Sequence, residues 1–345
     1  MATFYPLHIK DIIQETEDAV SITFTIPDTL KNVFTFIAGQ YITIKTTLKN
    51  QEVRRAYSIC SSPNSGEITV AVKRIEGGNF SVYATTELKK GTTMDVSPPE
   101  GKFILESASE NNKNYLAFTA GSGVTPIMAM IKDVLETEKN STFTVVFGNK
   151  SVKSALFYNA LNLLQKEHPT SFFITHLFSQ EKADNASFGR IDASVVNTIM
   201  EKNEAFSDVF LCGPEEMILT VKDTLEQKGF PENKIHFELF TKKESSSENT
   251  ALDGESEITI LLDDETTTFK MQQNDNILKA ALAKDLDAPY SCQGGICSSC
   301  LAKITEGKAI MKSNSILSKE EVEEGYILTC EAHPTTAKIT IDYDI

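Results

Sequence analysis

Hydrophobic and polar residues alternate in short runs over the first hundred residues of the chain. Glycine, proline or asparagine separates these runs, which occupy residues 19–26, 41–48, 54–59, 67–75 and 92–97. Alternation with a period of two predicts β-strands that bury one face, and closely spaced strands joined by turns are typical of small antiparallel barrels. We therefore expect residues 1–108 to form an antiparallel β-barrel domain.

From about residue 111 the pattern changes to buried strands that alternate with helices. The expected strands are 114–120, 142–148, 172–178, 208–213 and 234–240, and the expected helices are 125–139, 154–168 and 214–229. Such alternation predicts βαβ units, in which a parallel sheet carries helices on both faces. Residues 109–240 are therefore expected to form an α/β domain.

A third domain is expected after a segment that has almost nothing to bury. Residues 241–254 have the composition of a flexible linker. The elements expected beyond it are a hairpin, a helix with Asp275 at its N-cap, a capping box formed by Ser318 and Glu321, and two final strands, over residues 257–262 and 267–271, 275–285, 318–325, 326–330 and 337–343. Residues 255–345 should form a mostly β module with one packed helix.

The charge of the chain narrows its possible partners. The net charge is −15, and 17 Asp and Glu against 8 Lys and Arg give residues 253–345 a net charge of −9. A nucleic-acid partner is not expected, because binding to phosphate backbones needs a basic surface. The local acidic excess favours either solubility alone or docking on a basic partner.

No membrane segment or export signal is expected. With 345 residues the chain can bury two or three separate cores, and it contains no run of about 18 apolar residues. The first twenty residues include acidic side chains and lack an apolar h-region, so they do not resemble a secretory signal. We therefore expect a cytoplasmic protein, in which structural disulfides are rare.

Four of the six cysteines form a spaced pattern, Cys292-x4-Cys297-x2-Cys300 followed by Cys330. Zinc sites usually combine two C-x2-C pairs, or one such pair with two histidines, and neither arrangement is complete here. The spacing matches the signature of plant-type [2Fe–2S] proteins, so an iron–sulfur cluster is favoured over zinc.

Small residues between these cysteines suit a cluster. Gly294 and Gly295 let the backbone turn tightly and direct N–H groups at sulfur, and Ser298 and Ser299 can donate hydrogen bonds. Donors of this kind stabilise the reduced cluster and help to set its potential.

Two stretches of the barrel region carry groups that suit a flavin. In "RAYS", Tyr57 can stack on an isoalloxazine, Arg55 can pair with a diphosphate, and Ser58 can hydrogen-bond a ring nitrogen. In "GGNFS", from Gly77 to Ser81, glycine N–H groups and a serine open a helix, which predicts an anion site. A hairpin turn with an ordinary N-cap is the alternative for the second stretch.

Two strand-to-helix turns of the α/β region suit a dinucleotide. "TAGSGVTP" places Gly121 and Gly123 after a buried strand and Pro126 in the first helical turn, although a proline at this third position departs from the standard fingerprint. "LCGPEEM" places Cys212 at the carboxyl edge of the sheet, where ligands bind in open α/β folds. A small core residue is the alternative for Cys212.

These motifs, in this order and at these intervals, resemble the ferredoxin–NADP reductase superfamily joined to a C-terminal plant-type ferredoxin module. R-x-Y-S, G-G-x-x-S, G-x-G-x-x-P and C-G-P-x-x-M carry the likeness, which covers essentially the whole chain. The resemblance implies a multidomain protein: an antiparallel β-barrel that binds FAD, an α/β parallel-sheet domain that binds NADPH, and an α+β β-grasp ferredoxin domain with a [2Fe–2S] cluster.

The resemblance also assigns residues to these groups. Tyr57, Ser58, Cys212 and Glu238 would be catalytic, with Tyr57 and Ser58 at the flavin and Cys212 beside the nicotinamide. The four spaced cysteines, Cys292, Cys297, Cys300 and Cys330, would hold the cluster. The other cofactor contacts would come from Arg55, Ala56, Val72, Lys73, Gly77, Gly78, Phe80, Ser81 and Phe240 for FAD, and from Gly121, Gly123, Thr125, Pro126, Lys150, Ser151, Ser179, Gly213, Pro214 and Met217 for the nucleotide.

The choice between NADPH and NADH depends on the residues after strand 142–148. Lys150, Ser151 and Lys153 follow it without an acidic residue, which favours the 2′-phosphate of NADPH. Many NADPH-using relatives have arginine at the position of Gln180, so NADH stays open as the alternative.

The partner implied by the resemblance is the oxygenase component of a multicomponent monooxygenase, in particular a di-iron epoxidase that acts on phenylacetyl-CoA. Electrons would pass to it from NADPH through FAD and the cluster. Ring-hydroxylating or demethylating oxygenases and a hybrid-cluster protein are alternative acceptors. An electron-transfer module that oxidises no nicotinamide is disfavoured by the intact glycine loop and by Cys212.

Overall fold

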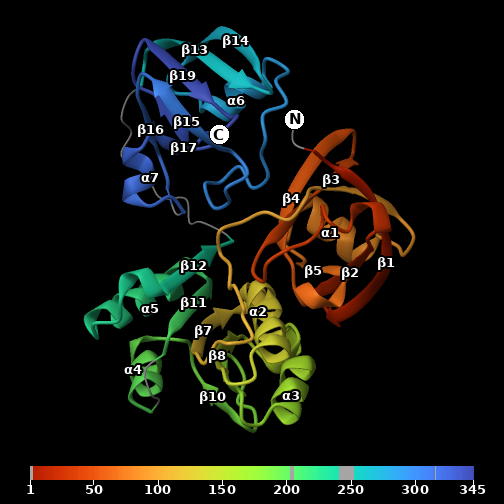
Figure 1. The fold of residues 1–345 in the computed structure, drawn as a ribbon. Helices are drawn as coiled ribbons and strands as arrows, with labels where there is room; N and C mark the ends of the chain where they lie inside the picture. Colours follow the sequence, from red (N-terminus) through yellow and green to blue (C-terminus); the bar gives the residue numbers. More distant parts are fainter. Residues whose placement is uncertain (1–2, 203–205, 241–251, 315) are drawn as a thin grey trace. The chain divides into compact units, whose positions relative to one another are not determined.

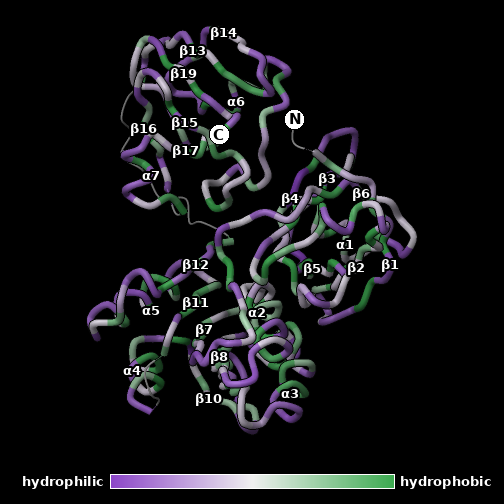
Figure 2. The backbone as a smooth tube through the Cα atoms, viewed as in Figure 1, coloured by the Kyte–Doolittle hydropathy of each residue, from purple (hydrophilic) through white to green (hydrophobic). Residues whose placement is uncertain are grey.

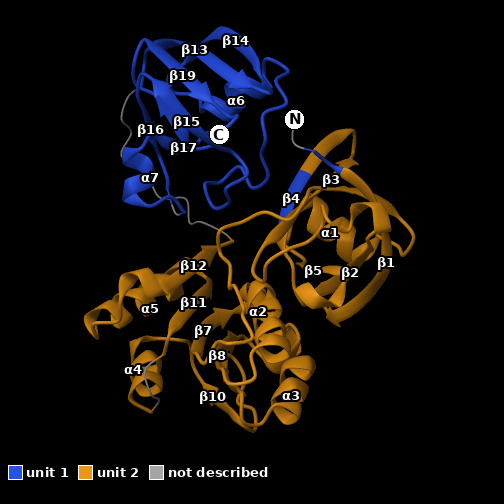
Figure 3. Cartoon of the chain, viewed as in Figure 1, with its two compact units in different colours: residues 1–4, 54–56, 241–345 blue, residues 5–53, 57–240 orange. Residues whose placement is uncertain are grey.

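The structure is a computed structural model that describes residues 3–202, 206–240, 252–314 and 316–345. It divides into two compact units, one of residues 5–53 and 57–240 and the other of residues 1–4, 54–56 and 241–345 (Figure 3). Most of the predicted linker, residues 241–251, lies outside the described residues. No helix in the described ranges is long and apolar enough to span a membrane.

The first unit begins with the predicted antiparallel barrel. Its sheet has the strand order β4-β3-β6-β1-β2-β5. An isolated antiparallel bridge between Ile59, just after β4, and Val70 on β5 joins the two edges of this sheet. The elements are β1 (Tyr5–Thr16), β2 (Ala19–Thr25), β3 (Tyr41–Leu48), β4 (Gln51–Ser58), β5 (Ile68–Lys73), β6 (Thr93–Val96) and α1 (Asn79–Thr86), with short 3-10 turns at Asp28–Leu30 and Pro63–Ser65.

The alternation of the sequence explains the core of this barrel. Pairs of buried residues two positions apart, such as Ile22 and Phe24 on β2 or Val70 and Val72 on β5, point inward. Strand β1 was missing from the sequence prediction, although it pairs with both β2 and β6. Its register shifts between Ile9 and Asp11, and this irregularity breaks the period of two on which the prediction relied.

The same unit contains the predicted α/β domain, whose sheet has the order β10-β9-β8-β7-β11-β12 with every pair parallel. Helices α2 and α3 cover one face of the sheet and α4 and α5 the other (Figure 1). The strands are β7 (Asn114–Ala120), β8 (Thr142–Asn149), β9 (Phe172–Phe178), β10 (Ala186–Phe188), β11 (Asp208–Gly213) and β12 (Ile235–Leu239), and the helices are α2 (Val124–Thr137), α3 (Tyr158–Glu167), α4 (Ala193–Lys202) and α5 (Glu215–Gln227), with 3-10 turns at Gly121–Gly123, Val152–Ser154 and Glu232–Lys234.

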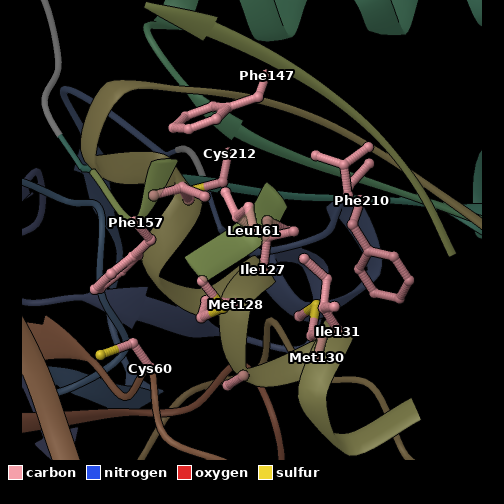
Figure 4. Packing of buried hydrophobic residues seen from close by; sticks show 14 of the residues in the cluster. Cys60, Ile127, Met128, Met130, Ile131, Phe147, Phe157, Leu161, Phe210 and Cys212 are labelled. Carbon is pink, nitrogen blue, oxygen red and sulfur yellow. The ribbon is translucent and has the colours of Figure 1, made fainter. Parts of the chain in front are cut away.

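One helix boundary in this domain differs from the prediction. The helix expected over 154–168 begins only at Tyr158, because Phe157 has a φ of 57°, in the left-handed region that ends regular helix. Phe157 nevertheless packs in the core with Leu161 and with α2, as Figure 4 shows. Helix α4 and the short strand β10 were not predicted.

Helix α2 joins the barrel to the α/β domain. In Figure 2 hydrophobic residues colour much of this helix, and its buried side is completed by polar contacts to the barrel. Lys132 donates to the carbonyl oxygen of Cys60 at 3.0 Å, Asn64 donates to Asp133 at 3.3 Å, and Ser62 donates to Glu136. These contacts make the barrel and the α/β domain one packed body.

The second unit contains a five-stranded sheet in the order β14-β13-β19-β15-β17 and a two-stranded sheet of β16 and β18. Strands β13 and β19 are parallel, and α6 packs its apolar residues in the core beneath them. The elements are β13 (Glu255–Leu262), β14 (Glu265–Gln272), β15 (Leu301–Glu306), β16 (Ala309–Met311), β17 (Tyr326–Leu328), β18 (Ala332–Pro334), β19 (Lys338–Asp342), α6 (Ile277–Leu282) and α7 (Lys319–Glu323).

The two helix starts predicted in this unit had different outcomes. Ser318 and Glu321 form the expected capping box at the start of α7. Asp275 was wrongly predicted as the N-cap of α6, because the adjacent Asn276 accepts from the backbone N–H of Lys279 instead. Asp275 pairs with the Lys279 side chain at 2.7 Å.

Gly39 offers a test of the contact between the barrel and α2. It is buried with a φ of +103°, and an added Cβ would collide with the Phe103 carbonyl oxygen and the end of Met130. We expect Gly39→Ala to destabilise the first unit by about 3 kcal/mol or more, which lowers its Tm by roughly 6–12 °C. Thermal release of the bound flavin, followed by fluorescence, measures this change.

The control for this substitution is Gly91→Ala. Gly91 also has a positive φ, +85°, but nothing lies within 4 Å of its added Cβ. It should therefore lose only about 1 kcal/mol, from the backbone conformation alone. Equal losses at the two positions would contradict the packing argument.

Candidate functional site

The order of the parallel sheet reverses between β7 and β11, and the carboxyl ends of these two strands meet the glycine loop. Thr119 on β7 donates to the carbonyl oxygen of Cys212 on β11 at 2.9 Å. A side chain at Gly123 would collide with that same carbonyl, so only glycine lets the loop lie against β11. Ligands of open α/β sheets bind at such a reversal point.

The loop leaves backbone donors available for an anion. Gly121 has a φ of +57° with open space around its Cβ position, and no side chain caps the N-terminus of α2 at Gly123. The helix start therefore combines free N–H groups with the positive end of the helix dipole. The Thr125 hydroxyl donates to the Ser122 carbonyl oxygen at 3.0 Å, and Pro126 occupies the first turn.

Three of the four predicted catalytic residues lie together at this edge. Cys212 and Glu238 are register partners on β11 and β12, and Ser58 at the end of β4 donates to Glu238 across a long hydrogen bond of 3.4 Å. These residues come from three strands and two domains. Figure 4 shows Cys212 above the residues of α2.

Burial changes the acid–base properties of this group. The Glu238 residue is half-buried but its carboxyl group is enclosed, which raises the pKa of Glu238 to about 8. Burial, and then the charge of Glu238, raises the pKa of the Cys212 thiol well above its usual value. Both side chains are therefore uncharged at neutral pH.

The predicted flavin residues form a second cluster on the barrel. The Tyr57 ring packs on Phe80 with centroids 5.6 Å apart. Gly78 is the N-cap of α1 and no side chain caps this helix start, while Gly77 has a φ of +73° and open space at its Cβ position. The Ser81 hydroxyl accepts from the backbone N–H of Ile75 at 3.1 Å, which shapes the loop. A free helix start next to an aromatic ring fits a flavin with a diphosphate.

The remaining predicted flavin residues are dispersed along β4, β5 and the end of the sheet. Arg55 is exposed and donates to the Arg54 carbonyl oxygen at 2.7 Å, and Val72 is buried in the barrel core. Lys73 donates to the Ser154 carbonyl oxygen at 3.3 Å. Phe240 packs at the margin of the α/β core, which also suits the alternative of a core aromatic.

At the other predicted nucleotide positions, backbone bonds tie the ends of β8 and β9 together. Ser179 donates from its backbone N–H to the Asn149 carbonyl oxygen at 3.0 Å, and Ser151 forms a capping box with Ser154 at the start of the 3-10 turn. Lys150 and Lys153 on this loop are exposed. Across the sheet, Pro214 is the N-cap of α5, and Met217 packs over Gly213.

The sequence prediction missed a carboxylate at this loop. Glu181, which follows β9, accepts from the backbone N–H of Val152 at 2.9 Å. It lies thirty positions from Ser151, so the local sequence after β8 contained no sign of it. The loop expected to be free of acid therefore has one negative charge at the start of its 3-10 turn.

The four predicted cluster ligands form two pairs. The Cys297 thiol donates to the Cys292 sulfur at 3.1 Å, and Cys300 is hydrogen-bonded to Cys330. The described residues contain no group of three or more His, Cys, Asp or Glu arranged around one metal ion. Two pairs of thiols fit a cluster of two irons, in which each iron takes two cysteine ligands.

Backbone donors support these pairs. Gly294 donates from its N–H to the Cys292 sulfur at 3.4 Å, as the sequence predicted. The Cys297 thiol, with help from this N–H, lowers the pKa of Cys292 to about 6. Cys330 likewise lowers the pKa of Cys300. One sulfur of each pair is thus ready to act as a thiolate, the form that binds iron.

Family models match all three domains. A model described as an oxidoreductase FAD-binding domain matches residues 6–104, one for an oxidoreductase NAD-binding domain matches residues 118–223, and one for a 2Fe-2S iron-sulfur cluster binding domain matches residues 260–335. The cofactors of this chain are therefore FAD, a pyridine nucleotide and a [2Fe–2S] cluster, which agrees with the donor groups described above.

Three comparisons extend over the full chain. A component protein of the 1,2-phenylacetyl-CoA epoxidase of Escherichia coli (strain K12) is 37% identical over 352 residues, which cover 100% of this chain and 99% of that protein. The ferredoxin reductase component of the 3-ketosteroid-9-alpha-monooxygenase of Rhodococcus rhodochrous is 31% identical and covers 98% and 96%. The phthalate dioxygenase reductase structure has the same fold, with a TM-score of 0.64, 22% identity and 98% of each chain covered.

Glu181 offers a test of nucleotide preference. Its charge repels a 2′-phosphate bound at the 150–154 loop, whereas a glutamine keeps the hydrogen bond to Val152 and removes the charge. We expect Glu181→Gln to raise kcat/KM for NADPH relative to NADH about threefold to tenfold, the effect of roughly 1 kcal/mol. Steady-state reduction of ferricyanide with each nucleotide measures the ratio.

The control is Glu167→Gln, which removes the same charge at the exposed end of α3. It should leave the ratio unchanged. An unchanged ratio in Glu181→Gln as well would show that the 2′-phosphate does not approach this carboxylate.

Proposed function

This chain belongs to the oxidoreductases of the ferredoxin reductase type that serve oxygenases as reductase components, and we propose that it supplies electrons from NADPH to a di-iron epoxidase of phenylacetyl-CoA. The likeness to a component of such an epoxidase over the whole length of both chains carries this proposal. The likeness to a ketosteroid monooxygenase reductase supports a second candidate, the same chemistry with another oxygenase as acceptor.

The proposal assigns a role to each cluster of residues. FAD, when bound, converts the two-electron chemistry of the nicotinamide into the one-electron transfers that the cluster accepts. The close contact of Gly123 with Cys212 positions the nucleotide loop against the end of β11. Tyr57, backed by Phe80, presents its ring to the flavin.

Ser58 and Glu238 hold a proton at the flavin side of this site. When Glu238 is neutral, its O–H can donate to the Ser58 oxygen, which leaves the Ser58 proton for a flavin ring nitrogen. When Glu238 is ionised, the Ser58 proton turns toward the carboxylate. The protonation of Glu238 therefore decides whether Ser58 serves the flavin.

We also propose the domain limits 1–108, 109–240, 241–254 and 255–345 for the flavin domain, the nucleotide domain, the linker and the ferredoxin domain. The matched family models fall within these limits. A cytoplasmic location is proposed as well. It is supported by the six cysteines, all of which are free thiols.

Reconstitution tests the proposed acceptor. The purified holoprotein, mixed with NADPH and the oxygenase components of a phenylacetyl-CoA epoxidase, should form the epoxide at a rate that depends on both partners. Reduction of cytochrome c in the same preparation confirms that the reductase itself is active. Cytochrome c reduction without epoxide formation would favour the second candidate, and the oxygenase component of a ketosteroid monooxygenase then becomes the comparison acceptor.

The raised pKa of Glu238 predicts a pH dependence. Below about pH 8 the carboxyl is neutral and Ser58 can serve the flavin, and above it the ionised form withdraws Ser58 and adds a negative charge. The rate of flavin reduction by NADPH, measured by stopped flow, should therefore fall as the pH rises through about 8. Glu238→Gln should keep a flat profile over this range.

Glu226→Gln is the matched control, since Glu226 lies on the exposed side of α5 in an ion pair with Lys222. It should retain the fall near pH 8. A fall that persists in Glu238→Gln would assign the titration to another group.

A further inference from the structure

A buried hydroxyl next to the cysteine loop has no hydrogen-bond partner. Ser291 immediately precedes Cys292 and is only 1% exposed. Its Oγ atom is enclosed and unpaired among the described residues. Leaving such a group unsatisfied costs about 1–3 kcal/mol, so an unpaired buried hydroxyl in a native protein calls for a missing partner.

The equally buried hydroxyl groups of this unit have found partners. Thr329, beside Cys330, donates to the Cys300 carbonyl oxygen at 3.0 Å and accepts from the Tyr343 hydroxyl at 2.9 Å. Ser256, at the far end of β13, donates to the Thr336 carbonyl oxygen at 2.6 Å. Ser291 therefore departs from the rule that its neighbours follow.

The chemistry of the bound cluster supplies the missing acceptor. Thiolate and bridging sulfide sulfurs accept hydrogen bonds, and the adjacent Cys292 sulfur already receives one from the Gly294 N–H. Donors to sulfur stabilise the more negative, reduced form of a cluster more than the oxidised form. We propose that the Ser291 hydroxyl donates a hydrogen bond to a sulfur of the [2Fe–2S] cluster and raises its reduction potential.

This makes Ser291 a residue that tunes the last electron carrier of the chain. It rests on the presence of the cluster and not on the identity of the oxygenase. A wrong acceptor would leave the potential unaffected, so the two proposals fail separately.

The test is a redox titration of the full-length holoprotein, followed by the EPR signal of the reduced cluster. In Ser291→Ala, the equilibrium between oxidised and reduced cluster should shift about threefold to tenfold toward the oxidised form. A tenfold shift corresponds to a potential about 59 mV more negative for a one-electron couple. Ser291→Thr, which keeps the hydroxyl, should return the potential toward the wild-type value.

Ser256→Ala is the matched control, because it removes a buried serine hydroxyl of the same unit that already has a protein partner. It should lower the Tm and leave the potential unchanged. Iron and acid-labile sulfide per chain are measured first, so that each titration refers to an assembled cluster. Resonance Raman spectra in H₂O and D₂O add a second readout: the Fe–S stretching bands of the wild type should shift on exchange, and part of that shift should vanish in Ser291→Ala.

An unchanged potential and an unchanged isotope shift in Ser291→Ala would overturn the proposal. If Ser291→Ala holds no cluster, a Ser291→Thr variant with a cluster of wild-type potential still supports the hydroxyl. Loss of the cluster in both variants would show that the position requires the shape of serine, and would also overturn the tuning role.

Discussion

The carbonyl oxygen of Cys212 leaves no room for a side chain at Gly123, and the candidate nucleotide site depends on this close approach. Because the glycine loop lies directly on the end of β11, the start of α2 and the Cys212 thiol face the same space. The register between β11 and β12 then places Glu238 beside Cys212, and the barrel contributes Ser58. One contact that only glycine permits thus brings together groups from the loop after β7, two further strands and the flavin domain.

A second theme is the control of protons by burial. Glu238 is a carboxyl group that stays neutral at pH 7 because its environment disfavours the charge, whereas each cysteine pair shares a proton so that one sulfur becomes a thiolate. The first arrangement suits a site where negative charge accumulates during the reaction. The second suits a metal cluster, which needs anionic ligands. The same chain therefore suppresses one charge and promotes another within its two units.

The parts of the fold predicted from sequence are those with regular local patterns. The parallel strands β7, β8 and β11 are continuous apolar runs, and the capping box at Ser318 requires only residues three positions apart. The failures have local irregularities as their cause. Strand β1 shifts its register, and Phe157 takes a left-handed conformation inside an otherwise helical pattern. At α6 two neighbouring polar residues could both cap the helix, and side-chain geometry chose Asn276 over Asp275.

The sequence by itself determined the cofactor classes, since the cysteine spacing and the glycine turns are short-range patterns set by the chemistry of iron and phosphate. Only the tertiary structure decided which distant residues modify these sites. Glu181 reaches the loop at Val152 from the next strand, Ser58 meets Glu238 across 180 positions, and Cys300 pairs with Cys330 rather than with its neighbour Cys297. Such contacts depend on strand order and register, which arise from the packing of the whole sheet and are not encoded in any local segment.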